Sequence, residues 1–414
     1  MRVFPHPVPW QRIKTADSWQ FPYCCHTVPS YTATATDVSA QLEKCKTMKI
    51  HARLAGLLTL VLSLSTAATE LPTELQGLDL READVASKDL PGWKKPQRIL
   101  VWAPFGPQLL DELRIAAPGV ELVAVANAEE AAAAVAGSQA VIGICDQSVL
   151  ANADQLHWIQ VYFAGVENCV SLPRVKEGIV LTNGQRLSSP TIADHAIAMT
   201  YALLRGLDIF HGNQAEGNWD RSATNTLRGF GELSGRTMLV VGLGGIGTQV
   251  AQRAHALGMR VVATRGSRRE GPDFVDYVGL SNEAVKLAAE ADVVVNALPL
   301  TDATKGMIDG SFFAAMKPGA YYINVGRGQT TVTADLLDAL NSGQIAGAGL
   351  DVTDPEPLPS DHPLWTTPRV IITPHVAATS AETLQRIQAL VAENLRRYVA
   401  GEALLSVVDI QRGY

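Results

Sequence analysis

One short glycine-rich segment constrains the fold of this chain more than any other feature. Apolar residues 239–241 lead into the sequence GLGGIG at 242–247, and residues 248–257 continue with a helical pattern. GxGxxG alone also fits a plain glycine-rich turn, but a strand before it and a helix after it favour a dinucleotide-binding unit. In such a unit Gly242 permits the tight turn, Gly244 lets the backbone approach a pyrophosphate, and Gly247 lets the helix pack on the strand.

Strand and helix patterns alternate on both sides of this loop. We expect strands at residues 99–102, 121–126, 140–145, 157–163 and 179–182, and again at 238–242, 260–264, 293–298, 321–325, 348–352 and 370–373. Long helices are expected at 191–211 and 381–399, and a shorter one at 333–340 with Thr333 as its N-cap. The sequence therefore predicts an α/β protein with two Rossmann-like, doubly wound parallel-sheet domains and an active-site cleft between them.

The amino-terminal quarter differs in character from the rest. Residues 69–97 are polar and acidic with three prolines, which is typical of a linker. Residues 48–68 begin with basic residues, continue with an apolar run and end with small residues, which is the pattern of a secretory signal. The apolar run is too short for a stable membrane span. Residues 1–47 are then a non-native or disordered extension before Met48. An amphiphilic leader without function is the alternative.

Composition excludes several classes of protein. The net charge is −7 and no long basic run occurs, so a nucleic-acid partner is not expected. Five cysteines in 414 residues are too few for a disulfide scaffold, and none has the spacing of a zinc site, so no metal is expected. Cys145 and Cys169 have no evident chemical role.

The end of the second strand in the glycine-loop unit selects the cofactor. An acidic residue there would bind the ribose 2′-hydroxyl of NAD, but none is present. Arginine side chains and a hydroxyl suit a phosphate instead, so NADP is expected in preference to NAD. The residues concerned are Thr264, Arg265, Ser267 and Arg268. The alternative is a solvated basic loop that accepts both cofactors.

Three polar residues follow later strands of the same unit. Arg327 lies in NVGRG, Glu356 in DVTDPEPLP and His375 in TPHVA. Carbonyl reduction needs a cation to polarise the carbonyl group, a histidine to supply the proton, and a carboxylate to orient that histidine. Singly, each side chain also fits a structural or solvated role. Together, behind a dinucleotide loop, they form a candidate catalytic set.

These segments, in this order, resemble the signatures of the D-isomer-specific 2-hydroxyacid dehydrogenases, and 351–359 is most similar to the glyoxylate/hydroxypyruvate reductase branch. The resemblance covers residue 98 onward. It implies that Arg327 holds the substrate, that His375 is the general acid and base, and that Glu356 is its partner. It also implies a substrate domain at 98–195 completed by 377–414, a cofactor domain at 196–376, and a homodimer.

The resemblance assigns further contacts. The substrate carboxylate would lie on the backbone of Ala164, Gly165 and Val166. The cofactor contacts would be Gly245 and Ile246 on the pyrophosphate, Leu298 and Pro299 beside the adenosine, and Val325, Gly326 and Asp351 at the nicotinamide. The aromatic pair at 162–163 departs from the small residues of many members, which leaves the substrate open.

The expected activity is hydride transfer between NAD(P)H and a small 2-keto acid. The alternative is a dinucleotide-sensing binding protein of the same fold without turnover. Localisation stays open in the sequence, because residues 48–68 indicate export whereas NADPH belongs inside the cell.

Overall fold

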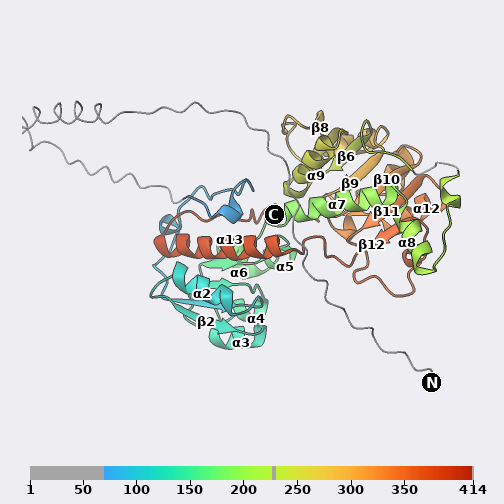
Figure 1. The fold of residues 1–414 in the computed structure, drawn as a ribbon. Coiled ribbons are helices and arrows are strands. Elements are labelled where there is room, and N and C mark those ends of the chain that lie inside the picture. The colour runs from blue at the N-terminus through green and yellow to red at the C-terminus, as the bar shows by residue number, and fades with distance from the viewer. Residues whose placement is uncertain (1–69, 226–229, 413–414) are drawn as a thin grey trace, which may run out of the picture. The chain divides into compact units, whose positions relative to one another are not determined.

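The computed structural model describes residues 70–225 and 230–412, which form an α/β fold with two parallel sheets (Figure 1). The predictions for residues 1–47 and 48–68 lie outside the described residues. Within those described ranges, no helix has both the length and the apolar character needed to cross a membrane.

The first sheet has five strands in the order β2-β1-β3-β4-β5, all parallel. They are β1 (Arg98–Trp102), β2 (Glu121–Val125), β3 (Ala140–Ile142), β4 (Trp158–Gln160) and β5 (Val180–Thr182). Its own helices are α2 (Pro107–Ala116), α3 (Ala128–Ala134), α4 (Gln147–Leu150), α5 (Glu167–Val170) and α6 (Pro173–Lys176). Side chains alternate along β1, so that Ile99 and Val101 enter one apolar core and Leu100 enters the other. Both faces of this sheet are therefore covered.

The last helix, α13 (Ala381–Ala400), packs on this first sheet and beside α2 (Figure 1). Its Leu390, Leu395 and Tyr398 are buried in the same core as Ile99. Ser380 caps the helix by accepting a hydrogen bond of 3.0 Å from the amide of Thr383. The first sheet is thus completed by the far end of the chain.

Residues 70–97, which were predicted as a linker from their polar composition, pack against the first sheet. They contain two short 3-10 helices, η1 (Thr73–Leu75) and η2 (Ser87–Asp89), and Leu75 is buried in the first core. The amide of Ala83 also donates to the carbonyl oxygen of Leu404 at 2.8 Å. Spaced leucines anchor this segment although the residues between them are polar.

The second sheet has seven parallel strands in the order β12-β11-β10-β9-β6-β7-β8. They are β6 (Thr237–Val241), β7 (Arg260–Arg265), β8 (Tyr277–Leu280), β9 (Val293–Asn296), β10 (Ala320–Asn324), β11 (Ile345–Leu350) and β12 (Val370–Ile372). Its helices include α9 (Gly245–Ala256), α10 (Ala284–Ala288), α11 (Gly310–Ala315) and α12 (Thr333–Asn341). The strand order reverses between β6 and β9, which is where such sheets bind ligands. Strand β8 had not been expected.

The helix expected at 191–211 is two helices, α7 (Ser189–Leu204) and α8 (Leu207–Ala215). Gly206 separates them with a left-handed φ of +64°, which a glycine adopts without strain. The prediction of Thr333 as an N-cap is also wrong, because Val332 is the cap and Thr333 is the first helical residue. The Thr333 hydroxyl donates instead to the carbonyl oxygen of Asp354 at 2.7 Å.

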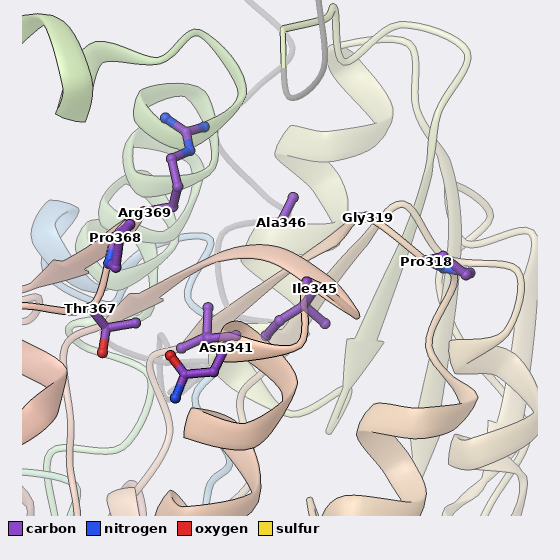
Figure 2. A pocket seen from close by; sticks show the side chains of 10 residues that line it. Pro318, Gly319, Asn341, Ile345, Ala346, Thr367, Pro368 and Arg369 are labelled. Atoms are coloured by element: carbon purple, nitrogen blue, oxygen red, sulfur yellow. The ribbon is translucent and has the colours of Figure 1, made fainter. Parts of the chain in front are cut away.

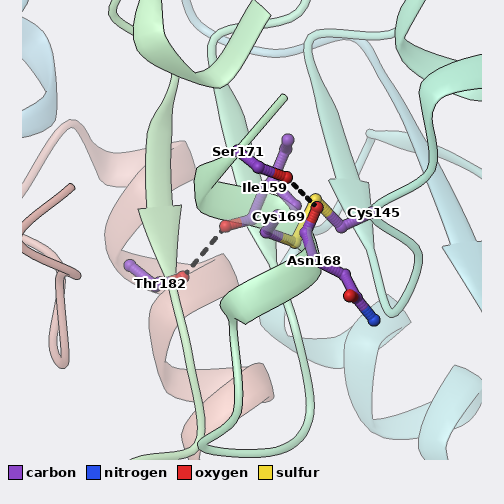
Figure 3. Close-up of a disulfide and its surroundings, with 6 residues drawn as sticks. All are labelled: Cys145, Ile159, Asn168, Cys169, Ser171 and Thr182. Carbon is purple, nitrogen blue, oxygen red and sulfur yellow. Dashed lines mark hydrogen bonds between the residues drawn. A yellow bond between two sulfur atoms is a disulfide. The ribbon is translucent and has the colours of Figure 1, made fainter. Parts of the chain in front are cut away.

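Two cysteines that the sequence left without a role form a disulfide (Figure 3). Cys145 follows β3 and Cys169 lies in α5, with their Cα atoms 5.8 Å apart. The disulfide therefore attaches α5 to the loop that follows β3. Close by, the Ser171 hydroxyl donates to the carbonyl oxygen of Asn168 at 3.2 Å (Figure 3).

Candidate active site

The glycine loop, Arg327 and His375 all follow carboxyl ends of strands in the second sheet. Gly242 comes directly after β6, Arg327 comes three residues after β10, and His375 comes three residues after β12. Because all these strands are parallel, the three segments lie along the same edge of the sheet.

The loop before α9 is shaped so closely by its neighbours that only glycine fits at two positions. Gly242 has a φ of +97°, and a Cβ there would lie 3.0 Å from the carbonyl oxygen of Ala297. A Cβ on Gly247 would lie 2.1 Å from the carbonyl oxygen of Gly242. Around Gly244 there is open space, so the loop backbone is accessible where α9 begins. This geometry fits a phosphate on the amino end of the helix.

The end of β7 offers unsatisfied positive charge beside that loop. Thr264 is buried, and its carbonyl oxygen accepts the amide of Leu243 at 2.8 Å. The next residue, Arg265, has a buried Nε without a hydrogen-bond partner in the described part of the chain. Burial, and then repulsion from Arg268 and Arg186, lowers the pKa of Arg265 below its ordinary value. Ser267 and Arg268 are exposed, so these residues fit a phosphate group on a nucleotide.

His375 and Glu356 form a close pair. The Nδ1 atom of His375 lies 2.6 Å from Oε1 of Glu356, and both side chains are about half exposed. The backbone of His375 has a left-handed φ of +55°, and its amide donates to the carbonyl oxygen of Asp351 at 2.8 Å. With Nδ1 on the carboxylate, Nε2 is the ring nitrogen left to exchange a proton with a substrate.

Asp351 supports the loop that carries His375. It is 3% exposed, and its carboxylate accepts the Thr373 hydroxyl at 2.6 Å and the amides of Val376 and Ala377 at 2.9 and 3.1 Å. His195 reaches the same hydroxyl through Nε2 at 2.9 Å. Because the Thr373 hydroxyl donates its hydrogen to Asp351, His195 Nε2 must donate to the Thr373 oxygen. Sequence reasoning missed His195 and Thr373, and the contact of Asp351 with a nicotinamide stays a prediction.

Arg327 meets a residue of the first sheet that the sequence analysis did not single out. Its Nε donates to Oε1 of Glu167 at 3.1 Å, and its Nη1 donates to the carbonyl oxygen of Gly326 at 2.9 Å. A Cβ on Gly165 would lie 3.0 Å from Nη2 of Arg327 and 2.9 Å from Oε2 of Glu167. The proposed carboxylate-binding loop and the arginine are therefore in contact. The one available signal was that Glu167 directly follows Val166.

The remaining predicted contacts line the loops after β9 and β10, apart from Ile246, which lies in the first turn of α9. Leu298 and Val325 are buried, whereas Pro299 is exposed and Ile246 is partly buried. A Cβ on Gly326 would lie 2.6 Å from the carbonyl oxygen of Leu298, so these two loops touch. In the first sheet, Ala164 and Gly165 are exposed while Val166 is buried in the core.

A separate hollow of about 660 Å³ lies at the opposite edge of the second sheet (Figure 2). Pro318, Ile345 and Arg369 line it, and they precede or begin β10, β11 and β12. It therefore opens at the amino ends of the strands, away from His375 and Arg327. In the described ranges, no group of three or more His, Cys, Asp or Glu side chains is arranged to hold a metal ion.

Comparison with known proteins agrees with this geometry. Residues 197–377 match the family model of the D-isomer specific 2-hydroxyacid dehydrogenase NAD binding domain. Glyoxylate reductase from Korarchaeum cryptofilum (strain OPF8) is 37% identical over 270 residues, which is 64% of this chain and 79% of the relative.

Two solved structures share the fold. The D-isomer specific 2-hydroxyacid dehydrogenase family protein from Aeromonas salmonicida subsp. salmonicida A449 has a TM-score of 0.67 and 30% identity, covering 76% of this chain and 99% of that one. The NADPH-dependent glyoxylate/hydroxypyruvate reductase from Sinorhizobium meliloti, solved with NADP and sulfate, has a TM-score of 0.66 and 25% identity, covering 77% and 100%.

The two-sheet fold and the dinucleotide loop define an NAD(P)-dependent oxidoreductase that acts on a CH–OH group. Within that class, the chain belongs to the D-isomer-specific 2-hydroxyacid dehydrogenase family.

Proposed function

We propose that this enzyme reduces a small 2-keto acid such as glyoxylate or hydroxypyruvate to the D-2-hydroxy acid, with NADPH preferred over NADH. The observation that carries this proposal is the pairing of His375 with Glu356 at 2.6 Å, on the same sheet edge as the glycine loop and Arg327. Relatives named as glyoxylate and hydroxypyruvate reductases support the substrate class.

The polar residues divide the tasks of this reaction between them. The reduced nicotinamide, when bound, supplies a hydride to the carbonyl carbon. Arg327 binds the substrate carboxylate and polarises the carbonyl oxygen, beside the exposed backbone of Ala164 and Gly165. Protonated His375 gives its Nε2 proton to that oxygen, and Glu356 stabilises the imidazolium through Nδ1. The reverse direction returns the proton to His375.

NADP preference rests on the end of β7. The unpartnered buried Nε of Arg265 and the exposed Ser267 and Arg268 are suited to a 2′-phosphate, and no acid is present there to bind a 2′-hydroxyl. The S. meliloti reductase binds NADP, which agrees with this choice. The alternative is that this loop accepts both cofactors. Comparing the dissociation constants of NADPH and NADH tests it.

The domain division and the assembly are further parts of the proposal. We place residues 70–187 and 381–412 with the first sheet, and 189–378 with the second, because α7 packs on α9 and because α7 and residues 377–378 share the second core. This moves the boundary from 195/196 to the start of α7. A homodimer, as the family resemblance implies, is tested by light scattering.

The decisive experiment replaces His375 with asparagine, which tolerates the left-handed backbone at that position. NADPH oxidation is followed with glyoxylate, hydroxypyruvate and bulkier 2-keto acids, and NADPH binding is measured separately. We expect H375N to lose most turnover and keep cofactor binding. His211, exposed on α8, provides the matched control H211N. Wild-type binding of NADPH without turnover of any acid would favour the dinucleotide-sensing alternative.

A further inference from the structure

Arg186 lies over the start of α9 although it belongs to the loop before α7. A Cβ on Gly245 would be 3.0 Å from the Cγ atom of Arg186 and 2.8 Å from Oγ of Ser189. Gly245 is the first residue of α9, so the Arg186 stem covers the turn whose amides would face a pyrophosphate. Arg186 itself has a left-handed φ of +71°, a backbone conformation that is strained for an arginine.

The guanidinium of Arg186 has only a weakly held partner among the described residues. Its Nη1 lies 2.8 Å from Oδ2 of Asp79, whose side chain is 88% exposed, while that of Arg186 is 35% exposed. Such a solvent-exposed ion pair contributes little, and a ligand of higher charge can replace it. Asp79 is fixed in place because its neighbours Leu78 and Leu80 pack on the first core.

Positive charge accumulates around this point. Arg186 and Arg268 both act on Arg265 by repulsion, and Glu270 is the acid that opposes them there. Arg265 also leaves its buried Nε unpartnered within the described ranges. Three arginines beside an open helix amino end form a surface that an anion with more than one charge would stabilise.

We propose that Arg186 exchanges Asp79 for the pyrophosphate of the dinucleotide, and so serves as a cofactor-binding residue supplied from outside the glycine loop. This inference rests on the proposed dinucleotide-dependent function. It separates two tasks: Arg186 binds the group common to both cofactors, whereas Arg265 binds the phosphate found only in NADPH. Residues 70–97 thereby act on the cofactor site through Asp79.

The test measures dissociation constants of NADPH and NADH by nicotinamide fluorescence, without substrate. R186Q is compared with R265Q and with R174Q, since Arg174 is 37% exposed and pairs with Glu177 away from α9. We expect R186Q to weaken both cofactors by the same factor, about tenfold for one lost charged contact. R265Q should weaken NADPH alone, and R174Q should weaken neither.

Other outcomes separate this inference from the proposed function. If R186Q binds both cofactors like wild type, or loses affinity for NADPH only, the pyrophosphate contact is refuted while the enzyme remains a dehydrogenase. If wild type binds neither cofactor, the proposed function itself fails. D79N should bind both cofactors at least as tightly as wild type, because the competing carboxylate is gone. Weaker binding by D79N would overturn the exchange.

Discussion

The contact between Glu167 and Arg327 makes a quantitative prediction about substrate affinity. Without substrate, the Glu167 carboxylate receives the Arg327 Nε–H at 3.1 Å and reaches the space above Gly165. In the proposed reaction, a 2-keto acid would place its own carboxylate at the same arginine and on the same loop. Glu167 therefore competes with the substrate, and E167Q removes the competing charge with little change of shape.

The size of the effect follows from the exposure of the pair. The side chains of Arg327 and Glu167 are 30% and 42% exposed, so the pair belongs with surface ion pairs worth about 0.2–1 kcal/mol. Substrate binding must break this pair at the cost of that free energy, so E167Q, which lacks the pair, should lower KM by at most about fivefold. Because the pair is broken before hydride transfer, kcat should change little.

Steady-state rates of NADPH oxidation at a fixed saturating cofactor concentration measure both constants. E177Q is the matched control, since Glu177, the C-cap of α6, pairs with Arg174 at 3.3 Å and not with Arg327. A lower KM with unchanged kcat supports competition. A KM that rises in E167Q would refute the reasoning, because Glu167 would then hold Arg327 in its productive orientation.

Three further predictions follow from other contacts. E356Q should lower kcat/KM for reduction about tenfold to a hundredfold, because the 2.6 Å hydrogen bond to His375 loses its negative charge. The pH–rate profile should change with it, and an unaltered profile would contradict the role of Glu356. N394A should destabilise the first sheet by about 2–4 kcal/mol in urea unfolding, because buried Asn394 bonds both backbone polar groups of Leu405; a loss below about 1 kcal/mol would count against it. Burial, aided by Lys94, lowers the pKa of His157 in the folded protein. As the pH falls, the imidazole is therefore protonated first in the unfolded chain, and the free energy of unfolding decreases below about pH 6.5. H157Q should reduce this dependence of stability on pH.

The strands were predictable from the sequence where apolar runs stood alone between turns. Strand β8 was missed because Tyr277–Leu280 is only four residues long and contains a glycine, so its pattern is weak. The break at Gly206 was missed because apolar residues continue on both sides of it. The spacing of apolar residues does not indicate where a helix ends if the same spacing continues in the next helix.

The sequence predicted the site residues that directly follow the ends of strands. It did not predict contacts between residues that are far apart in the sequence and are brought together by the fold. His375 and Glu356 are 19 residues apart, and their pairing could be expected from function. Glu167 and Arg327 are 160 residues apart and come from different sheets. Arg186 is separated from Gly245 by α7, α8 and β6. Apart from the position of Glu167 directly after Val166, nothing in the sequence alone marks such neighbours, because the fold creates them.

The position of α13 has a consequence for biosynthesis. Its buried Leu390, Leu395 and Tyr398 complete a core whose strands are all made before residue 183. While the chain emerges from the ribosome, that apolar face stays uncovered until the final helix has been released. The sheet formed by β6 to β12 is contiguous in sequence and can fold earlier. The half of the protein translated first is thus the half that finishes folding last, and a stop codon before Ala381 would leave it with an open, aggregation-prone surface.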